Sequence, residues 1–213
     1  MQRTDFEQFV KIRYPKMFSC SISEACLEKY REIFRYNLLC ERKEVSGNVV
    51  VTESAKALEL ILNSYIKQTR KEDVVNKYWS VIQYVPDVND MMDAFDIKDC
   101  TAKQTEINRA KHGSIRPQVS LMNNFKRISG KSIMEKYYFL IADAYFNESS
   151  HFRNLLIKEG DSIIKMLDYV GLKRNRFGAH NDGDRVAVIS KKDFKVFQEY
   201  FTKTTRVLLE YLD

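Results

Sequence analysis

The sequence predicts an all-α protein. The chain of 213 residues holds only seven glycines and three prolines, which is few for a fold that depends on many tight turns. Apolar residues recur at intervals of three and four over most of the chain, which is the period of an amphipathic helix. A hydrophobic content of 44% beside 30% charged residues is typical of a globular protein with a core of its own.

The N-terminal part predicts two helices. Residues 1–20 contain a short helix that Pro15 ends, because proline lacks the backbone N–H that a helix interior needs. A second helix fits residues 23–44, where apolar side chains recur at helical spacing. Gly47 and Asn48 then interrupt the helical pattern.

These boundaries suggest two regions. We expect residues 1–50 to form an N-terminal helical segment and residues 51–213 to form the main helical domain. The N-terminal segment is either a separate arm or part of the same bundle, and the sequence leaves both interpretations open.

The main domain is expected to begin with three helices. Thr52 is the predicted N-cap of a helix that reaches Ile66. The next helix covers residues 72–84 and stops before Pro86, and residues 87–95 add a short one. Together they supply apolar stripes that need a common core.

A basic stretch follows at residues 98–131. Gly113 and Pro117 divide it into a predicted helix, a turn and a second helix, and a mobile loop over part of it is an equally open interpretation. The basic residues around His112 fit an RNA-binding edge, although a solvated charged face is the more common explanation of such a cluster.

The C-terminal part predicts further helices. An amphipathic helix fits residues 132–145, and helical patterns follow over 148–157 and 161–170 with a kink at Gly160. Gly171 is expected to end this helical stretch. Farther on, the pattern predicts a short extended piece over residues 186–189 and a final helix over residues 191–212.

Charge and cysteine content limit the setting of the protein. The formal net charge is +6, which suits a polyanionic partner such as RNA. No apolar stretch is long enough to span a bilayer, and charged residues interrupt the N-terminus where a signal peptide would lie. The four cysteines show neither CxxC pairs nor metal-ligand spacing, so we expect free thiols, a cytoplasmic protein, and no metal or cofactor.

One short segment points to chemistry. It contains an arginine and a histidine six residues apart, an amide beside the arginine and a carboxylate past the histidine; it reads Arg174-Asn175-Arg176-Phe177-Gly178-Ala179-His180-Asn181-Asp182. Arginine holds phosphate and keeps its charge at every working pH, whereas histidine exchanges protons near neutrality. These are the residue types that RNA cleavage without a metal requires.

The expected roles follow from that chemistry. His180 would act as general base or acid, and Arg174 would hold the phosphate and stabilise the charge of the transition state. Asn175 would orient either partner as the third catalytic residue. Three further residues are expected to bind the substrate: Lys173, Arg176 and Asp182. One histidine does not easily serve as both base and acid, and a two-fold dimer with two copies of the segment removes that difficulty.

The pattern resembles the HEPN superfamily, and its abortive-infection branch in particular, whose motif commonly reads R-[ND]-[KR]-x-x-A-H-x-D. The resemblance covers roughly residues 160–213. It implies an all-α bundle that dimerises with both motifs at the interface and cleaves RNA through Arg174 and His180. It also implies a toxin or phage-defence role with an antitoxin or defence-system partner protein. In some members the antitoxin modifies a tyrosine two residues after the histidine; this chain has Asp182 there, which argues against that neutralisation.

Two other interpretations stay open. A non-catalytic helical module could bind RNA or a protein through the same surface. Alternatively, Arg174 could balance the dipole at the end of a helix, while His180 and Asp182 play structural roles.

Overall fold

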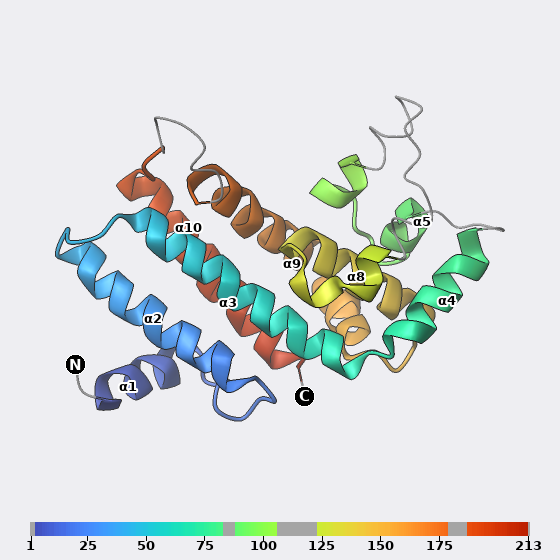
Figure 1. Cartoon of the computed structure of the whole chain (residues 1–213), viewed down its shortest axis with the longest axis horizontal. Helices are drawn as coiled ribbons and strands as arrows, with labels where there is room; N and C mark the ends of the chain where they lie inside the picture. Colours follow the sequence, from blue (N-terminus) through green and yellow to red (C-terminus); the bar gives the residue numbers. More distant parts are fainter. Residues whose placement is uncertain (1–2, 83–87, 106–122, 179–186, 213) are drawn as a thin grey trace. The chain divides into compact units, whose positions relative to one another are not determined.

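The computed structural model describes residues 3–82, 88–105, 123–178 and 187–212, and within these residues it contains helices and no strand (Figure 1). The predicted all-α class is therefore confirmed for the described part of the chain. The chain forms two compact units, one of residues 1–64 with 169–213 (unit 1) and one of residues 65–168 (unit 2). The division at residue 50 that the sequence suggests stays a prediction.

Unit 1 is built from helices at both ends of the sequence. It contains α1 (Arg3–Arg13), α2 (Glu24–Glu41), most of α3 (Gly47–Gln68), the end of α9 (His151–Phe177) and α10 (Lys191–Glu210). The predicted helices at the N-terminus and the C-terminus are confirmed, with boundaries close to those expected. In Figure 1, α2 and α3 run side by side, and an ion pair between Lys29 of α2 and Glu53 of α3 at 2.7 Å links the two helices.

Serine side chains fix where two of these helices begin. The hydroxyl of Ser23 accepts a hydrogen bond from the backbone N–H of Cys26, and that of Ser190 accepts one from Asp193. Such caps satisfy a backbone donor that would otherwise lack a partner in the first turn. The serine caps explain why α2 and α10 start where the sequence predicts.

The core of unit 1 is aromatic. The buried rings of Tyr14 and Tyr30 meet edge to face with centroids 5.1 Å apart, and Tyr30 stacks on Phe201 of α10 at 5.7 Å. The buried hydroxyl of Tyr30 lies 2.7 Å from Thr205 Oγ1, so neither group is left without a hydrogen-bond partner. Ring packing and one buried polar pair therefore hold Tyr14, the residue after α1, together with α2 and α10.

The start of α3 differs from the sequence prediction. Thr52 was expected to cap this helix, whereas α3 begins at Gly47, and Thr52 lies more than one turn inside it. The Asn48 side chain binds the backbone on both sides of residue 188: its amide donates to Ala187 O, and its oxygen accepts from Ile189 N. These long-range contacts hold residues in a helix that local propensity alone would interrupt.

Unit 2 contains the end of α3, α4 (Lys71–Ile82), α5 (Val88–Asp93), the short 3-10 helix η1 (Ile128–Gly130), α8 (Ile133–Phe146) and the first part of α9. The helices predicted over residues 72–84, 87–95 and 132–145 are confirmed as α4, α5 and α8, and those over 148–157 and 161–170 are parts of α9. α8 is buried on almost every side, including Lys136 and Asp143, rather than along one stripe as the sequence pattern suggested. The hydroxyl of Ser150 donates to the Asp143 carboxylate, which gives that buried acid a partner.

Aromatic contacts also form the core of unit 2. The hydroxyls of Tyr78 in α4 and Tyr138 in α8 lie 2.9 Å apart, and the Phe125 ring contacts both tyrosine rings edge to face. Tyr137 of α8 donates to Asp168 of α9 at 2.7 Å. α4, α8 and α9 therefore share one core through rings whose polar ends are satisfied.

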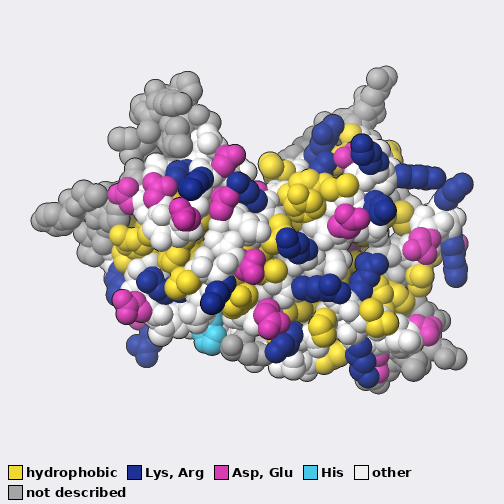
Figure 2. Space-filling model, turned by 180° about the vertical axis from the view of Figure 1, so that it is seen from behind, with side chains coloured by type: hydrophobic (Ala, Val, Ile, Leu, Met, Phe, Trp, Pro, Cys, Tyr) yellow, Lys and Arg dark blue, Asp and Glu magenta, His cyan; other side chains and the backbone are white. Residues whose placement is uncertain are grey.

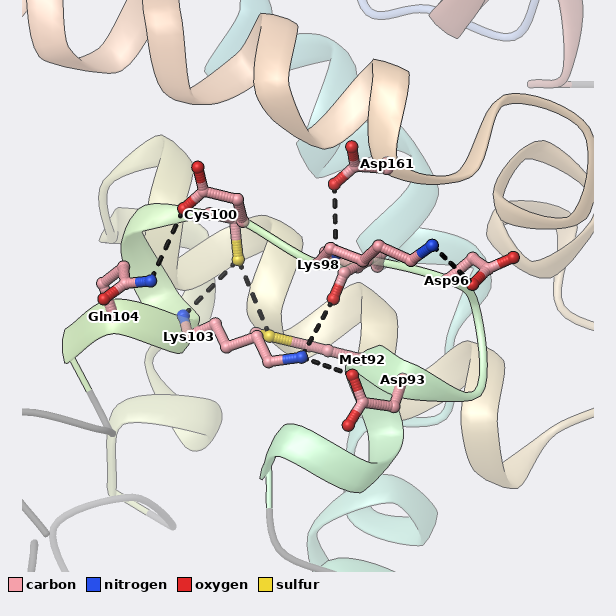
Figure 3. Close-up of polar contacts among 10 residues, drawn as sticks. Met92, Asp93, Asp96, Lys98, Cys100, Lys103, Gln104 and Asp161 are labelled. Atoms are coloured by element: carbon pink, nitrogen blue, oxygen red, sulfur yellow. Dashed lines mark hydrogen bonds and ion pairs between the residues drawn. The ribbon is translucent and has the colours of Figure 1, made fainter.

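The connection after α5 is tied to neighbouring helices, as Figure 3 shows. The backbone N–H of Lys98 donates to Asp161 of α9 at 3.2 Å, and Lys103 pairs with Asp93 of α5. Cys100 is buried next to Met92, with 3.6 Å between the sulfur atoms. This anchoring holds the described beginning of the predicted basic stretch, of which residues 106–122 lie outside the described residues.

α9 bends at Gly160, as the sequence predicts. Gly160 has φ +45° and ψ −127°, a conformation that glycine adopts without the penalty other residues carry. The expected end at Gly171 is wrong, since α9 continues to Phe177. Burial of Val170 and Phe177 on either side of the glycine favours helix over the interruption that glycine propensity predicts.

Two findings concern the surface. Among the described helices, none is long and apolar enough to cross a membrane. Basic and acidic side chains alternate over the face shown in Figure 2, with apolar side chains between them. The excess of positive charge is therefore not gathered in one patch on the described part of that face.

Candidate functional site

The arginine half of the motif lies in the last two turns of α9. The sequence predicted a break before this segment, but Lys173, Arg174, Asn175 and Arg176 are all helical. Consecutive residues of a helix point in directions about 100° apart, so the four side chains face different neighbours. The contacts of each side chain therefore show whether the fold holds it in place or leaves it exposed to solvent.

Arg174 faces α3. Its Nη1 donates a hydrogen bond to Glu59 Oε1 at 2.9 Å, and the side chains of Arg174 and Glu59 keep 27% and 17% of their surface exposed. A guanidinium has five donors in a rigid fork, so this bond to Glu59 leaves donors for another acceptor. The arginine is thus held in one orientation by a partner, yet it remains reachable from solvent.

Sequence reasoning missed Glu59. A usable signal was present, because Glu59 falls at helical spacing with Ala55 and Leu62, both of which are fully buried. A carboxylate on the apolar stripe of a helix needs a cationic or hydrogen-bonding partner. That partner is Arg174, which is 115 residues away in the sequence.

Gly178, the residue after α9, lies against α3. A Cβ atom at this position would lie 2.0 Å from Thr52 Oγ1, well inside contact distance. Phe177, the last residue of α9, is buried beside it. The chain that leads to His180 is therefore anchored against α3 up to two residues before the histidine.

Lys173 faces α10 rather than solvent. Its Nζ lies 3.5 Å from Asp193 Oδ1, and its side chain is 17% exposed. The ammonium also lies over the rings of Tyr169 and Phe177, at 5.3 and 5.7 Å from their centroids. Lys173 thus helps to join α9 to α10, which leaves it less free to bind a substrate than the sequence suggested.

The hydrogen bond from the Ser190 hydroxyl, followed by the charge of Lys173, holds the pKa of the Asp193 carboxyl below its usual range. Asp193 therefore stays ionised at neutral pH. It supplies a charge in the first turn of α10, where the helix dipole also favours a carboxylate.

Asn175 and Arg176 are exposed. The Arg176 guanidinium lies over the Phe177 ring, 5.4 Å from its centroid. Both side chains can therefore reach a ligand at the end of α9 without first losing a buried partner. Of the predicted site residues that the structure describes, these two are the most open to solvent.

His180 and Asp182 lie outside the described residues. The distance between Arg174 and His180 is accordingly not part of the described geometry, and the assignment of both residues to one site stays a prediction. His112 also lies outside that part of the chain, whereas His151 is exposed as the first residue of α9.

Two chemical roles fit the arginine half. A fixed, partly exposed guanidinium can bind phosphate and stabilise charge that grows on it during a reaction. Arg174 and Arg176 also lie in the last turn of α9, where positive charge stabilises the helix dipole. Among the described residues no group of histidine, cysteine, aspartate or glutamate side chains is arranged to hold a metal ion.

Comparisons with known proteins do not assign the chain to a group: no protein-family model, no curated protein and no solved structure matches it.

Proposed function

We propose that this chain is a metal-independent endoribonuclease of HEPN type that acts in a toxin or phage-defence system. The observation that carries the proposal is the ion pair that holds Arg174 in place at the end of α9, with a 27% exposed side chain. Glu59 of α3 orients the arginine, and Thr52 of α3 lies against Gly178, two residues before His180 in the sequence. Such preorganisation is what electrostatic stabilisation of a transition state requires.

The proposed reaction uses the 2′-hydroxyl of the RNA as nucleophile. His180 of one protomer takes the proton of that hydroxyl, and the oxygen attacks the adjacent phosphorus. Arg174 stabilises the negative charge of the phosphorane, and the bond to the 5′-oxygen then breaks. That oxygen leaves with a proton from His180 of the second protomer, which gives a 2′,3′-cyclic phosphate and a 5′-hydroxyl.

A homodimer is part of the proposal because one chain offers one motif histidine. Cyclic two-fold dimers bring the same surface of two chains together, so two copies of the end of α9 would supply two histidines and two arginines. Glu59 would act as a positioning residue, since it contacts Arg174 rather than substrate.

A non-catalytic RNA-binding or protein-binding module is the second candidate. The observation that favours it is that the Glu59 carboxylate already partly neutralises Arg174. In that case the exposed Asn175 and Arg176 would bind a partner at the end of α9 without chemistry.

Cleavage of RNA by point variants tests the proposal. Arg174→Ala and His180→Ala are each expected to lower the rate at least about 100-fold, as the loss of a group that acts on the transition state does. Arg31→Ala is the matched control for arginine, because Arg31 is also ion-paired and its side chain is 25% exposed, close to Arg174. His151→Ala is the corresponding control for histidine. Equal rates in all four variants would contradict the nuclease proposal.

Mixing wild-type and variant chains tests the dimer. A heterodimer of wild-type and His180→Ala chains retains one of the two histidines, so it lacks either the base or the acid, and its activity is expected to fall to nearly that of His180→Ala alone. If RNA binding persists with no cleavage by the wild-type chain, the binding-module function replaces the enzyme.

A further inference from the structure

A stacked aromatic pair lies at the surface of unit 1, between α9 and α10. The rings of Tyr169 and Tyr200 are 4.4 Å apart with an angle of 26° between their planes. Tyr200 is 40% exposed, and Tyr169 is half-buried. A ring stack that remains open to solvent contributes less to the core than the buried rings of Tyr14 and Tyr30 do. Core packing therefore does not explain why this pair is exposed.

Positive charge surrounds this pair. Lys173 lies over the Tyr169 ring, and the exposed side chains of Arg176 and Lys203 are three residues beyond Lys173 and Tyr200 on their helices. Residues three apart lie on neighbouring positions of one helix face. Two acidic side chains also lie here: Asp193 is paired with Lys173, and the exposed Glu199 is one helical turn before Lys203.

From this arrangement we propose that Tyr200, supported by Tyr169, stacks an unpaired base of single-stranded RNA, while Arg176 and Lys203 contact the flanking phosphates. This subsite rests on the proposed function and names its substrate as a single strand. Exposed aromatic rings bind bases of every sequence through their π-faces, and basic neighbours hold the backbone. A duplex buries the faces of its bases in its own stack, so it cannot use such a ring.

The subsite is separate from the cleavage position. Arg174 faces α3 and Lys173 faces α10, so the two lie on different sides of the last turns of α9. A strand with one base on Tyr200 therefore crosses the end of α9, where Asn175 and Arg176 are exposed, before its phosphate meets Arg174. The subsite therefore holds a nucleotide that lies beside the cleaved phosphate in the strand.

RNA suits this surface better than a second copy of the chain. A two-fold dimer through this patch would bring Arg176 and Lys203 of both copies into one interface, where four cations repel one another. The exposed Leu172 next to Lys173 adds apolar surface that either occupant could cover, so the charge decides between them.

Binding of RNA that cannot be cleaved tests the subsite. The probe is a single-stranded oligomer of about 12 nucleotides with 2′-O-methyl groups, which lack the nucleophile, beside a duplex of the same length. Tyr200→Leu is expected to raise the Kd for the single strand about tenfold, and Tyr200→Phe to keep it. Lys203→Ala is expected to reduce the slope of log Kd against log salt concentration by about one, because one phosphate contact is lost. Phe18→Leu removes another exposed ring of unit 1 and should change nothing.

Each outcome of this experiment either supports the subsite or overturns it. Equal affinity of Tyr200→Leu and wild type, or equal binding of duplex and single strand, would overturn the subsite even if the protein cleaves RNA. Tyr200-dependent binding without cleavage would instead refute the nuclease and keep the subsite. A change of oligomeric state in Tyr200→Leu with unchanged RNA affinity would show a protein interface there.

Discussion

Arg174 and Glu59 form an ion pair that joins the end of α9 to the middle of α3, with Nη1 and Oε1 2.9 Å apart. The pair orients the guanidinium that the proposed chemistry needs, and it also stabilises unit 1. A double-mutant cycle with Arg174→Ala and Glu59→Ala separates these effects, because it isolates the energy of the contact. We expect a coupling of about 0.5–1 kcal/mol in the free energy of unfolding, measured by urea denaturation, as for pairs that keep part of their solvent.

The activity of Glu59→Gln gives the second half of this prediction. Glutamine keeps a hydrogen-bond acceptor but not the charge, so we expect kcat to fall about tenfold and KM to change little. Activity equal to that of wild type would mean that Glu59 has only a structural role.

The close approach of Gly178 to Thr52 predicts a position that does not tolerate a side chain. Gly178→Ala should lower the free energy of unfolding by about 1–3 kcal/mol, because the new methyl group overlaps the Thr52 hydroxyl. Gly130→Ala is the matched control, since a Cβ there meets nothing within 4 Å. Thermal denaturation followed by circular dichroism measures both.

A second-site change sharpens the same test. Adding Thr52→Ala removes the clashing oxygen, so the double variant should recover most of the stability lost in Gly178→Ala. If the double variant is no more stable than Gly178→Ala, the contact with Thr52 is not the cause.

The kink at Gly160 predicts a cost for any other residue there. The φ of +45° and ψ of −127° lie in a region that residues with a Cβ avoid, and Phe95 O is 3.3 Å from where that Cβ would be. Gly160→Ala should destabilise the protein by about 1–3 kcal/mol. Stability equal to or above that of wild type in urea would show that α9 can straighten at no cost.

The Cys26 thiol is expected to be inert in the folded protein. Burial raises its pKa to about 12, so roughly one molecule in 10⁴ carries the reactive thiolate at pH 8. The stabilisation linked to this shift is complete below the unfolded value of 9.0 and is lost as the pH rises from 9.0 to about 12. Alkylation at pH 8, mapped by mass spectrometry, should label the half-buried Cys40 before Cys26. Labelling of Cys26 first would contradict its burial.

Local signals predicted much of the fold. Apolar spacing located α2, α8 and α10. The kink at Gly160 followed from glycine itself, because its conformational freedom is a property of one residue.

Long-range contacts account for what local signals missed. Gly47 and Gly171 interrupt helical patterns in the sequence, yet Gly47 begins α3 and Gly171 lies inside α9. The Asn48 side chain, which binds Ala187 and Ile189 on a distant segment, secures the first of these helices. No local pattern contains such a partner, so propensity alone gave the wrong boundary.

The candidate site shows the same limit. Chemistry singled out Arg174, because arginine near histidine is a recognisable pairing. Its partner Glu59 and the contact of Gly178 with Thr52 depend on how α3 packs against α9. The role expected of Lys173 changes for the same reason, since Asp193 of α10 pairs with it.

The most direct test of the central claim is the chemical nature of the RNA ends that the purified protein makes in EDTA. The account predicts 2′,3′-cyclic phosphate and 5′-hydroxyl ends from the wild-type chain, and loss of these products in both Arg174→Ala and His180→Ala. Cleavage that leaves 3′-hydroxyl and 5′-phosphate ends, or cyclic ends made equally well by both variants, would contradict it.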